Sequence, residues 1–231
     1  MARDVIRRHL DLSDPANRHF LCEPDAREQH QTQWHQWGII SHTRVFLHLF
    51  DTEIPGLLRE WGLWEPVHDH LRREIDGAAR WQLLRIAILL HDIGKFAART
   101  RGPRRFHFTH HEVLSGQIIR SGLQLQRFHL TPAQIEYIAE TAEDHFVLGL
   151  VRKRAREEEG YDEEFVASPE FAQLCRAIVR EHPDDFIEVG VLFLGDSLSK
   201  VRPNEGPEPA RSQYEINLQV AHRYLAVVLD E

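Results

Sequence analysis

The chain has 231 residues, of which 42% are hydrophobic and 28% charged, and this composition favours a globular protein with one continuous core. Its formal net charge of −8 argues against extensive nucleic-acid binding, and its two cysteines, Cys22 and Cys175, exclude a disulfide framework. No apolar run reaches the length of a membrane span and the first residues lack a signal-peptide pattern, so we expect a cytoplasmic protein.

The N-terminal region is polar, and we expect residues 1–36 to form a loosely structured arm. Helical spacing begins after Gly38. The first apolar stripe comprises His42, Val45, Phe46 and Leu49. A more polar helix is expected over residues 66–76. Trp34, His35 and Trp37 precede the first helix, where they either line a pocket or serve as packing residues.

The next predicted helix is strongly apolar and covers residues 81–93. Gly94 is placed to end this helix in a left-handed turn. A loop follows. Thr109 and Glu112 then have the spacing of a capping box, which predicts that a helix begins near His110.

Further helices are expected in the second half of the chain. Thr131 and Gln134 form another capping box, with a proline at the first helical position between them. Residues 164–181 and 186–200 also follow the helical period, and residues 211–229 contain a last amphipathic helix. The apolar stripe of that last helix suits core packing, with a homodimer contact as the alternative.

No segment has a convincing strand pattern, so we predict an all-α fold with a single helical domain. Residues 37–200 would form the body of this domain. Residues 201–231 would form a loop and a helix that pack on the same body, after the arm of residues 1–36.

Five of the predicted helices place a metal-capable side chain on their apolar face. These side chains are His42, the His91-Asp92 pair, His111, His145 and Asp196. Buried imidazoles and carboxylates are costly unless they are paired or bind a metal. A single buried histidine is more often a hydrogen-bonded core residue, whereas two adjacent polar residues after the apolar run 86–90 make poor core material. Of the neighbours His110 and His111, the apolar spacing favours His111 as the inward one.

These residues resemble the ordered H…HD…D signature of the HD-domain superfamily of metal-dependent phosphohydrolases. The segment 90–95, Leu-His-Asp-Ile-Gly-Lys, is similar to the core motif of that family, and the segments 41–45 and 110–116 are similar to its flanking motifs. The HD domains attached to tRNA nucleotidyltransferases look closest, although they usually have glycine where this chain has His110. No Gly-Ser with an Asp-x-Asp pair lies upstream, so nucleotide addition is not expected.

The resemblance implies that His42, His91, Asp92 and Asp196 bind one divalent cation. His111 and His145 would supply ligands for a second cation, with Asp92 as the bridge. The alternative is a single cation, with these two histidines binding phosphate instead. Imidazoles combined with carboxylates suit Mn, Fe, Co, Ni or Zn, and Mg less typically.

The expected reaction is hydrolysis of a phosphomonoester or phosphodiester of a small nucleotide. A divalent cation activates water and neutralises phosphoryl oxygens, and we assign Asp92 and Lys95 to catalysis. Lys95, Arg99 and Arg44 are our candidates for substrate binding. Arginine forks suit phosphate, and the segment between Lys95 and His111 contains four arginines and no acidic residue.

Two other functions remain open for the same ligand set. A regulatory module would bind metal and nucleotide without turnover, and an HD-type di-iron oxygenase would use the same ligand order for oxidation. Metal content and a panel of phosphoesters would distinguish these classes.

Overall fold

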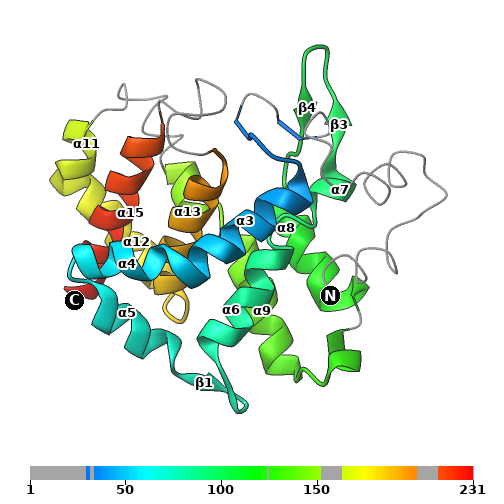
Figure 1. The fold of residues 1–231 in the computed structure, drawn as a ribbon, viewed down its shortest axis with the longest axis horizontal. Coiled ribbons are helices and arrows are strands. Elements are labelled where there is room, and N and C mark those ends of the chain that lie inside the picture. Colours follow the sequence, from blue (N-terminus) through cyan, green and yellow to red (C-terminus); the bar gives the residue numbers. More distant parts are fainter. Residues whose placement is uncertain (1–29, 32–33, 124, 152–162, 202–212, 231) are drawn as a thin grey trace.

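The computed structural model describes residues 30–31, 34–123, 125–151, 163–201 and 213–230. Within them the fold is all-α, as predicted (Figure 1). The longer helices are α3 (Ile39–Thr52), α6 (Arg80–Leu90), α9 (Pro132–Asp144), α12 (Pro169–Glu181), α13 (Phe186–Ser199) and α15 (Tyr214–Leu229). The shorter ones are α4 (Ile54–Glu60), α5 (Trp64–Leu71), α7 (Lys95–Ala98), α8 (His111–Gln117) and α11 (Glu163–Ala167), with a π-turn at Ile118–Gly122 and a 3-10 turn at Leu125–Phe128.

Several helix boundaries follow from their caps. The side chain of Thr131 accepts a hydrogen bond from the backbone N–H of Gln134, which confirms the predicted capping box at the start of α9. Ser168 caps α12 in the same way and interrupts the single helix that we predicted over 164–181. The polar helix predicted over 66–76 is shorter and ends at Leu71.

The capping prediction before α8 was wrong. The helix begins at His111, and its N-cap residue is His110, which has no side-chain cap and a left-handed backbone with φ of 58°. Glycine adopts this conformation without strain.

The predicted left-handed turn at Gly94 was also wrong, because the residue is right-handed with φ of −62°. A Cβ at this position would lie 2.0 Å from the backbone oxygen of His111. Glycine is required here because α8 approaches the end of α6 closely.

Two short antiparallel strand pairs were not predicted. β1 (Glu74–Ile75) pairs with β2 (Ala78–Ala79), and β3 (Thr100–Arg101) pairs with β4 (Phe106–His107). The first hairpin turns at Asp76-Gly77, where both residues have positive φ, a pairing that favours tight hairpins. The second hairpin projects from the helical body beside α7 and α8 (Figure 1).

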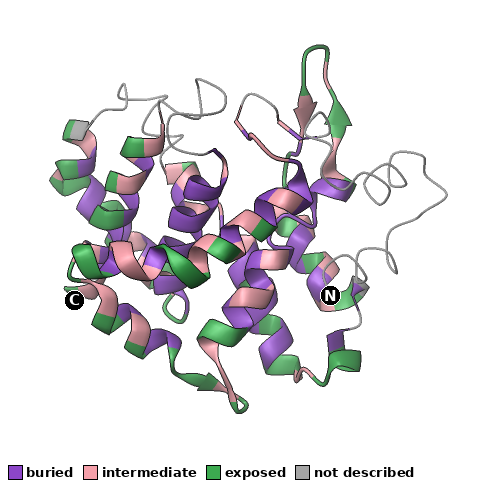
Figure 2. Ribbon diagram, viewed as in Figure 1, coloured by how far each residue is buried: buried purple, intermediate pink, exposed green. Residues whose placement is uncertain are grey.

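The core lies between α3, α6, α9 and α13, and buried residues line their facing sides (Figure 2). Helices α3 and α13 pack very closely, since a Cβ on Gly195 would lie 1.8 Å from the ring of Phe46. Helix α15 packs on α12 and α13 through buried side chains, so the last amphipathic helix is used for the core. In the described part of the chain, no helix has the length and apolar character needed to cross a membrane.

Candidate metal centre

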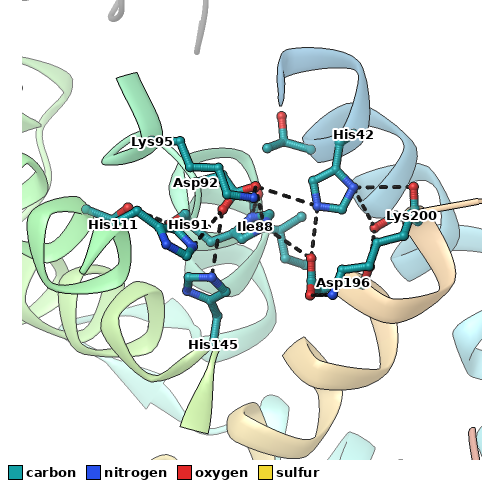
Figure 3. Close-up of polar contacts among 12 residues, drawn as sticks. His42, Ile88, His91, Asp92, Lys95, His111, His145, Asp196 and Lys200 are labelled. Atoms are coloured by element: carbon teal, nitrogen blue, oxygen red, sulfur yellow. Dashed lines mark hydrogen bonds and ion pairs between the residues drawn. The ribbon is translucent and has the colours of Figure 1, made fainter. Parts of the chain in front are cut away.

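The six predicted ligands meet at one place in the core (Figure 3). His42 lies on α3 and Asp196 on α13. The His91-Asp92 pair follows the end of α6, His145 follows the end of α9, and His111 is the first residue of α8. All six side chains are buried. His111 faces the centre, whereas the side chain of His110 is 78% exposed, so the apolar spacing identified the inward histidine.

The two carboxylate oxygens of Asp92 face different histidine pairs. Oδ2 lies 3.7 Å from Nε2 of His42 and 3.6 Å from Nε2 of His91. Oδ1 lies 3.3 Å from Nε2 of His111 and 3.8 Å from Nε2 of His145. Asp92 therefore has the position that a bridging carboxylate between two cations would have.

Asp196 belongs to the first of these two sides. Its Oδ1 lies 2.9 Å from Nε2 of His42 and 3.8 Å from Nε2 of His91. Two groups have ligand atoms within 4.8 Å of one another: His42, His91 and Asp196, and His91, Asp92 and His145. The His91 ring thus lies where the two groups meet.

All four imidazoles are oriented through their Nδ1 atoms. Each Nδ1 contacts a backbone carbonyl: His42 that of Ser199 at 3.3 Å, His91 that of Ile88 at 2.8 Å, His111 that of Phe108 at 2.8 Å, and His145 that of Ala142 at 2.6 Å. A carbonyl only accepts hydrogen bonds, so Nδ1 carries a proton and Nε2 is the atom that faces the carboxylates. This arrangement is typical of histidines that bind metals. In His42, Nε2 is itself hydrogen-bonded to Oδ1 of Asp196 at 2.9 Å.

Two buried atoms of the six ligands have no hydrogen-bond partner among the residues that the structure describes. They are Nε2 of His91 and Oδ1 of Asp92. An unpaired buried polar atom carries a free-energy cost that a bound cation removes. The donor set of imidazole nitrogens and carboxylate oxygens therefore fits a divalent metal.

Two lysines keep the carboxylates ionised. Nζ of Lys95 lies 2.7 Å from Oδ2 of Asp92, and Nζ of Lys200 lies 2.6 Å from Oδ2 of Asp196. Burial is the largest single influence and would raise the pKa of each carboxyl, but the lysine charge and the neighbouring histidines together outweigh it and hold both pKa values well below their usual range. The carboxylates are therefore in the form that binds a cation.

Sequence reasoning missed part of this site. Residues 1–36 were expected to be a polar arm, yet His30 is buried beside the centre. His35, which the sequence offered as a pocket or packing residue, is buried there too, with its ring centroid 4.7 Å from that of His42. The rest of that arm, apart from 31, 34 and 36, lies outside the described residues. Lys200 was also missed, although its i,i+4 spacing from Asp196 is a visible signal.

The three candidates for substrate binding differ in position. Lys95 is buried at the centre. Arg99 is half-buried at the base of the β3–β4 hairpin, with its guanidinium 5.2 Å from the ring centroid of Phe106. Arg44 is exposed. It lies two positions after His42, about 200° around α3, so the structure does not bring it to the ligands.

A third metal-capable group lies elsewhere and consists of Asp144, His182 and Asp185. Nδ1 of His182 lies 2.6 Å from Oδ2 of Asp144, so this group already contains an ion pair of its own. None of its three residues belongs to the six-residue centre.

Comparison with known proteins identifies no relative, because no protein-family model matches the chain and no curated protein is significantly similar to it.

Proposed function

We propose that this protein is a metal-dependent phosphohydrolase of the HD type, acting on a phosphomonoester or phosphodiester of a small nucleotide. The observation that carries the proposal is the position of Asp92, with one carboxylate oxygen facing His42 and His91 and the other facing His111 and His145. Dinuclear hydrolytic centres need this kind of shared carboxylate between two ligand sets.

The ligands divide between two cation positions. His42, His91, Asp92 and Asp196 would hold one cation, and His111 and His145 would hold the other, with Asp92 shared. Cations bound here would lower the pKa of water and neutralise charge on a phosphoryl group. The protein supplies fixed Nε2 lone pairs and a water-poor surrounding, in which charges interact more strongly.

Lys95 would bind the phosphoryl oxygens. Its ammonium already lies at 2.7 Å from Asp92, which places a fixed positive charge at the centre of the ligand set. Such a charge stabilises the negative charge that develops in the transition state.

The β3–β4 hairpin supplies positive charge at the rim. Arg101, Arg104 and Arg105 are exposed on it. The hairpin joins α7, which carries Lys95, to α8, which carries His111. Arg99 at its base is the first candidate for a second phosphate contact, because a guanidinium pairs with two oxygens at once.

The test compares two double variants, each of which replaces both residues of one His-Asp dipeptide of this chain. The purified protein, loaded in turn with Mn, Fe, Co, Ni, Zn or Mg, is assayed on a panel of nucleotide phosphoesters. His91→Ala with Asp92→Ala should lower turnover by a factor of at least about 10³, as expected for loss of a catalytic metal or oxyanion contact. The matched control is His68→Ala with Asp69→Ala on α5, a half-buried and an exposed residue that should leave turnover unchanged.

Full turnover in the His91/Asp92 variant would refute the proposal. Oxygen consumption by the iron-loaded protein without phosphoester hydrolysis would replace it with an oxygenase. Bound nucleotide with no turnover on any member of the panel would replace it with a regulatory module.

A further inference from the structure

His30 reaches the centre from outside the helical body. It is 2% exposed, and its Nε2 lies 3.0 Å from Nζ of Lys95. The imidazole stacks on His35 with ring centroids 3.7 Å apart, and the edge of Phe108 lies 5.9 Å away. The backbone N–H of Gln36 donates to the carbonyl of Lys200 at 2.7 Å, which attaches this segment to the end of α13.

The other ring nitrogen fixes the tautomer of His30. Its Nδ1 lies 3.1 Å from the backbone oxygen of Trp37. Because that oxygen only accepts, Nδ1 carries the proton and Nε2 presents a lone pair. Burial, followed by the charge of Lys95, lowers the pKa of His30 well below its usual range, so the ring is neutral.

In this contact, the ammonium of Lys95 therefore donates a hydrogen bond to Nε2 of the neutral His30 ring. A lysine ammonium has three N–H groups. One is directed at Oδ2 of Asp92 and one at Nε2 of His30. These are its two side-chain acceptors among the described residues, and they leave the third N–H for a ligand oxygen.

The contact has little value as packing alone. Lysine has a flexible four-carbon stem and loses rotamer entropy when its head is held. A neutral acceptor gives no ion pair to offset that loss. What the acceptor adds is direction, since two fixed acceptors define where the third N–H of Lys95 points.

We propose that His30 is a positioning residue that orients the Lys95 ammonium toward the phosphoryl oxygen of the substrate. This role rests on the proposed phosphohydrolase function. His30 itself does not touch the substrate, and it acts only through Lys95.

The first experiment compares two variants of His30. His30→Leu removes the acceptor, whereas His30→Gln keeps an acceptor oxygen on a side chain of similar reach. We expect kcat of His30→Leu on the best phosphoester to fall roughly tenfold, as for loss of a hydrogen bond to a charged group. KM should change less than kcat, and His30→Gln should recover most of the rate. His48→Leu, an exposed histidine of α3, is the control and should match wild type.

The second experiment needs no turnover. The sequence contains three lysines, Lys95, Lys153 and Lys200. Each can be followed separately by mass spectrometry during limited amine labelling. Labelling of Lys95 should be several-fold faster in His30→Leu than in wild type or His30→Gln, while Lys200 is labelled equally in all three. Nitrogen NMR of wild type should also show His30 as the tautomer protonated at Nδ1.

Equal labelling of Lys95 in all variants, or a His30 protonated at Nε2, overturns the positioning role whatever the activity. A loss of rate in His30→Gln as large as in His30→Leu also overturns it and leaves only a structural role. If His30→Leu does not fold, the positioning role is still tested by the tautomer of His30 in wild type and by the rate of His30→Gln relative to wild type. If labelling behaves as expected but no phosphoester is cleaved, the contact stands and the proposed function fails.

Discussion

Helix α13 carries two buried carboxylates, and their surroundings differ. Glu188 accepts from Nε2 of His70 at 2.9 Å, from Arg80 at 3.0 Å and from the hydroxyl of Tyr137 at 2.7 Å. Two turns further on, Asp196 joins a cluster in which atoms of His91 and Asp92 have no hydrogen-bond partner.

The two clusters are equally buried but differ in their completeness. Around Glu188 the chain supplies every partner, which is what a structural polar network requires. Around Asp92, carboxylate oxygens and imidazole Nε2 atoms converge, and the described residues supply too few N–H and O–H groups to pair with all of them. Burial of polar groups therefore does not by itself indicate a functional site, whereas a surplus of acceptors is what a cation-binding site requires.

The largest expected effect is on folding stability at the Glu188 cluster. Glu188→Ala should lower the free energy of unfolding by about 3–5 kcal/mol, because it removes the buried carboxylate that accepts from His70, Arg80 and Tyr137 at once. Denaturant unfolding in the presence of a chelator measures this loss. Asp92→Asn under the same conditions should cost clearly less, since it removes a negative charge from the acceptor surplus and keeps an amide oxygen that can accept from the ammonium of Lys95. If Asp92→Asn costs as much as Glu188→Ala, the distinction between the two clusters fails.

An effect of intermediate size is expected when a divalent cation is added, and it is a rise in folding stability. A cation that binds only the folded chain stabilises it by about 2.7 kcal/mol at a hundredfold excess over Kd. Wild type should therefore show a higher Tm with Mn, Co, Ni or Zn than with chelator. The gain should vanish in the variant combining His91→Ala and Asp92→Ala.

Asp185→Asn, in the separate group with Asp144 and His182, should keep that gain. If Asp185→Asn instead loses the metal-dependent rise in Tm, and the His91/Asp92 variant keeps it, the cation binds at Asp144, His182 and Asp185 and not at the six-residue centre.

The smallest effect is a pH dependence at Glu188. Burial alone would raise the pKa of this carboxyl, but the hydrogen bond from His70 and the charge of Arg80 lower the pKa overall. A lowered folded-state pKa gives stability that is complete above the unfolded value of about 4.3 and is lost as pH falls through the folded value. Wild type should therefore lose more stability than Glu188→Gln between about pH 5 and pH 3. Parallel curves for the two proteins would contradict this.

The helical part of the centre was predictable because each ligand lies on an apolar face. His42, His111 and Asp196 follow the spacing of buried residues in their helices, so sequence alone placed them inward. The paired oxygens of Asp92 were inferred only through a family resemblance.

The rest could not be predicted from helical period. His30 and His35 lie in a segment without regular spacing, so their burial depends on tertiary contacts to Lys95 and His42. Arg44 was a candidate for substrate binding, but it is exposed and lies about 200° around α3 from His42. The hairpin at Asp76-Gly77 did have a local signal, because that dipeptide favours a tight turn.

The order of the ligands along the chain has a consequence during protein synthesis. His91, Asp92 and His145 lie within one stretch of the chain and can meet while the C-terminal helices are still being made. The group of His42 and His91 needs Asp196, which is 154 residues beyond His42. The ligands of one half of the centre are therefore all synthesised before α13, and the ligand set of the other half is complete only after α13 has left the ribosome.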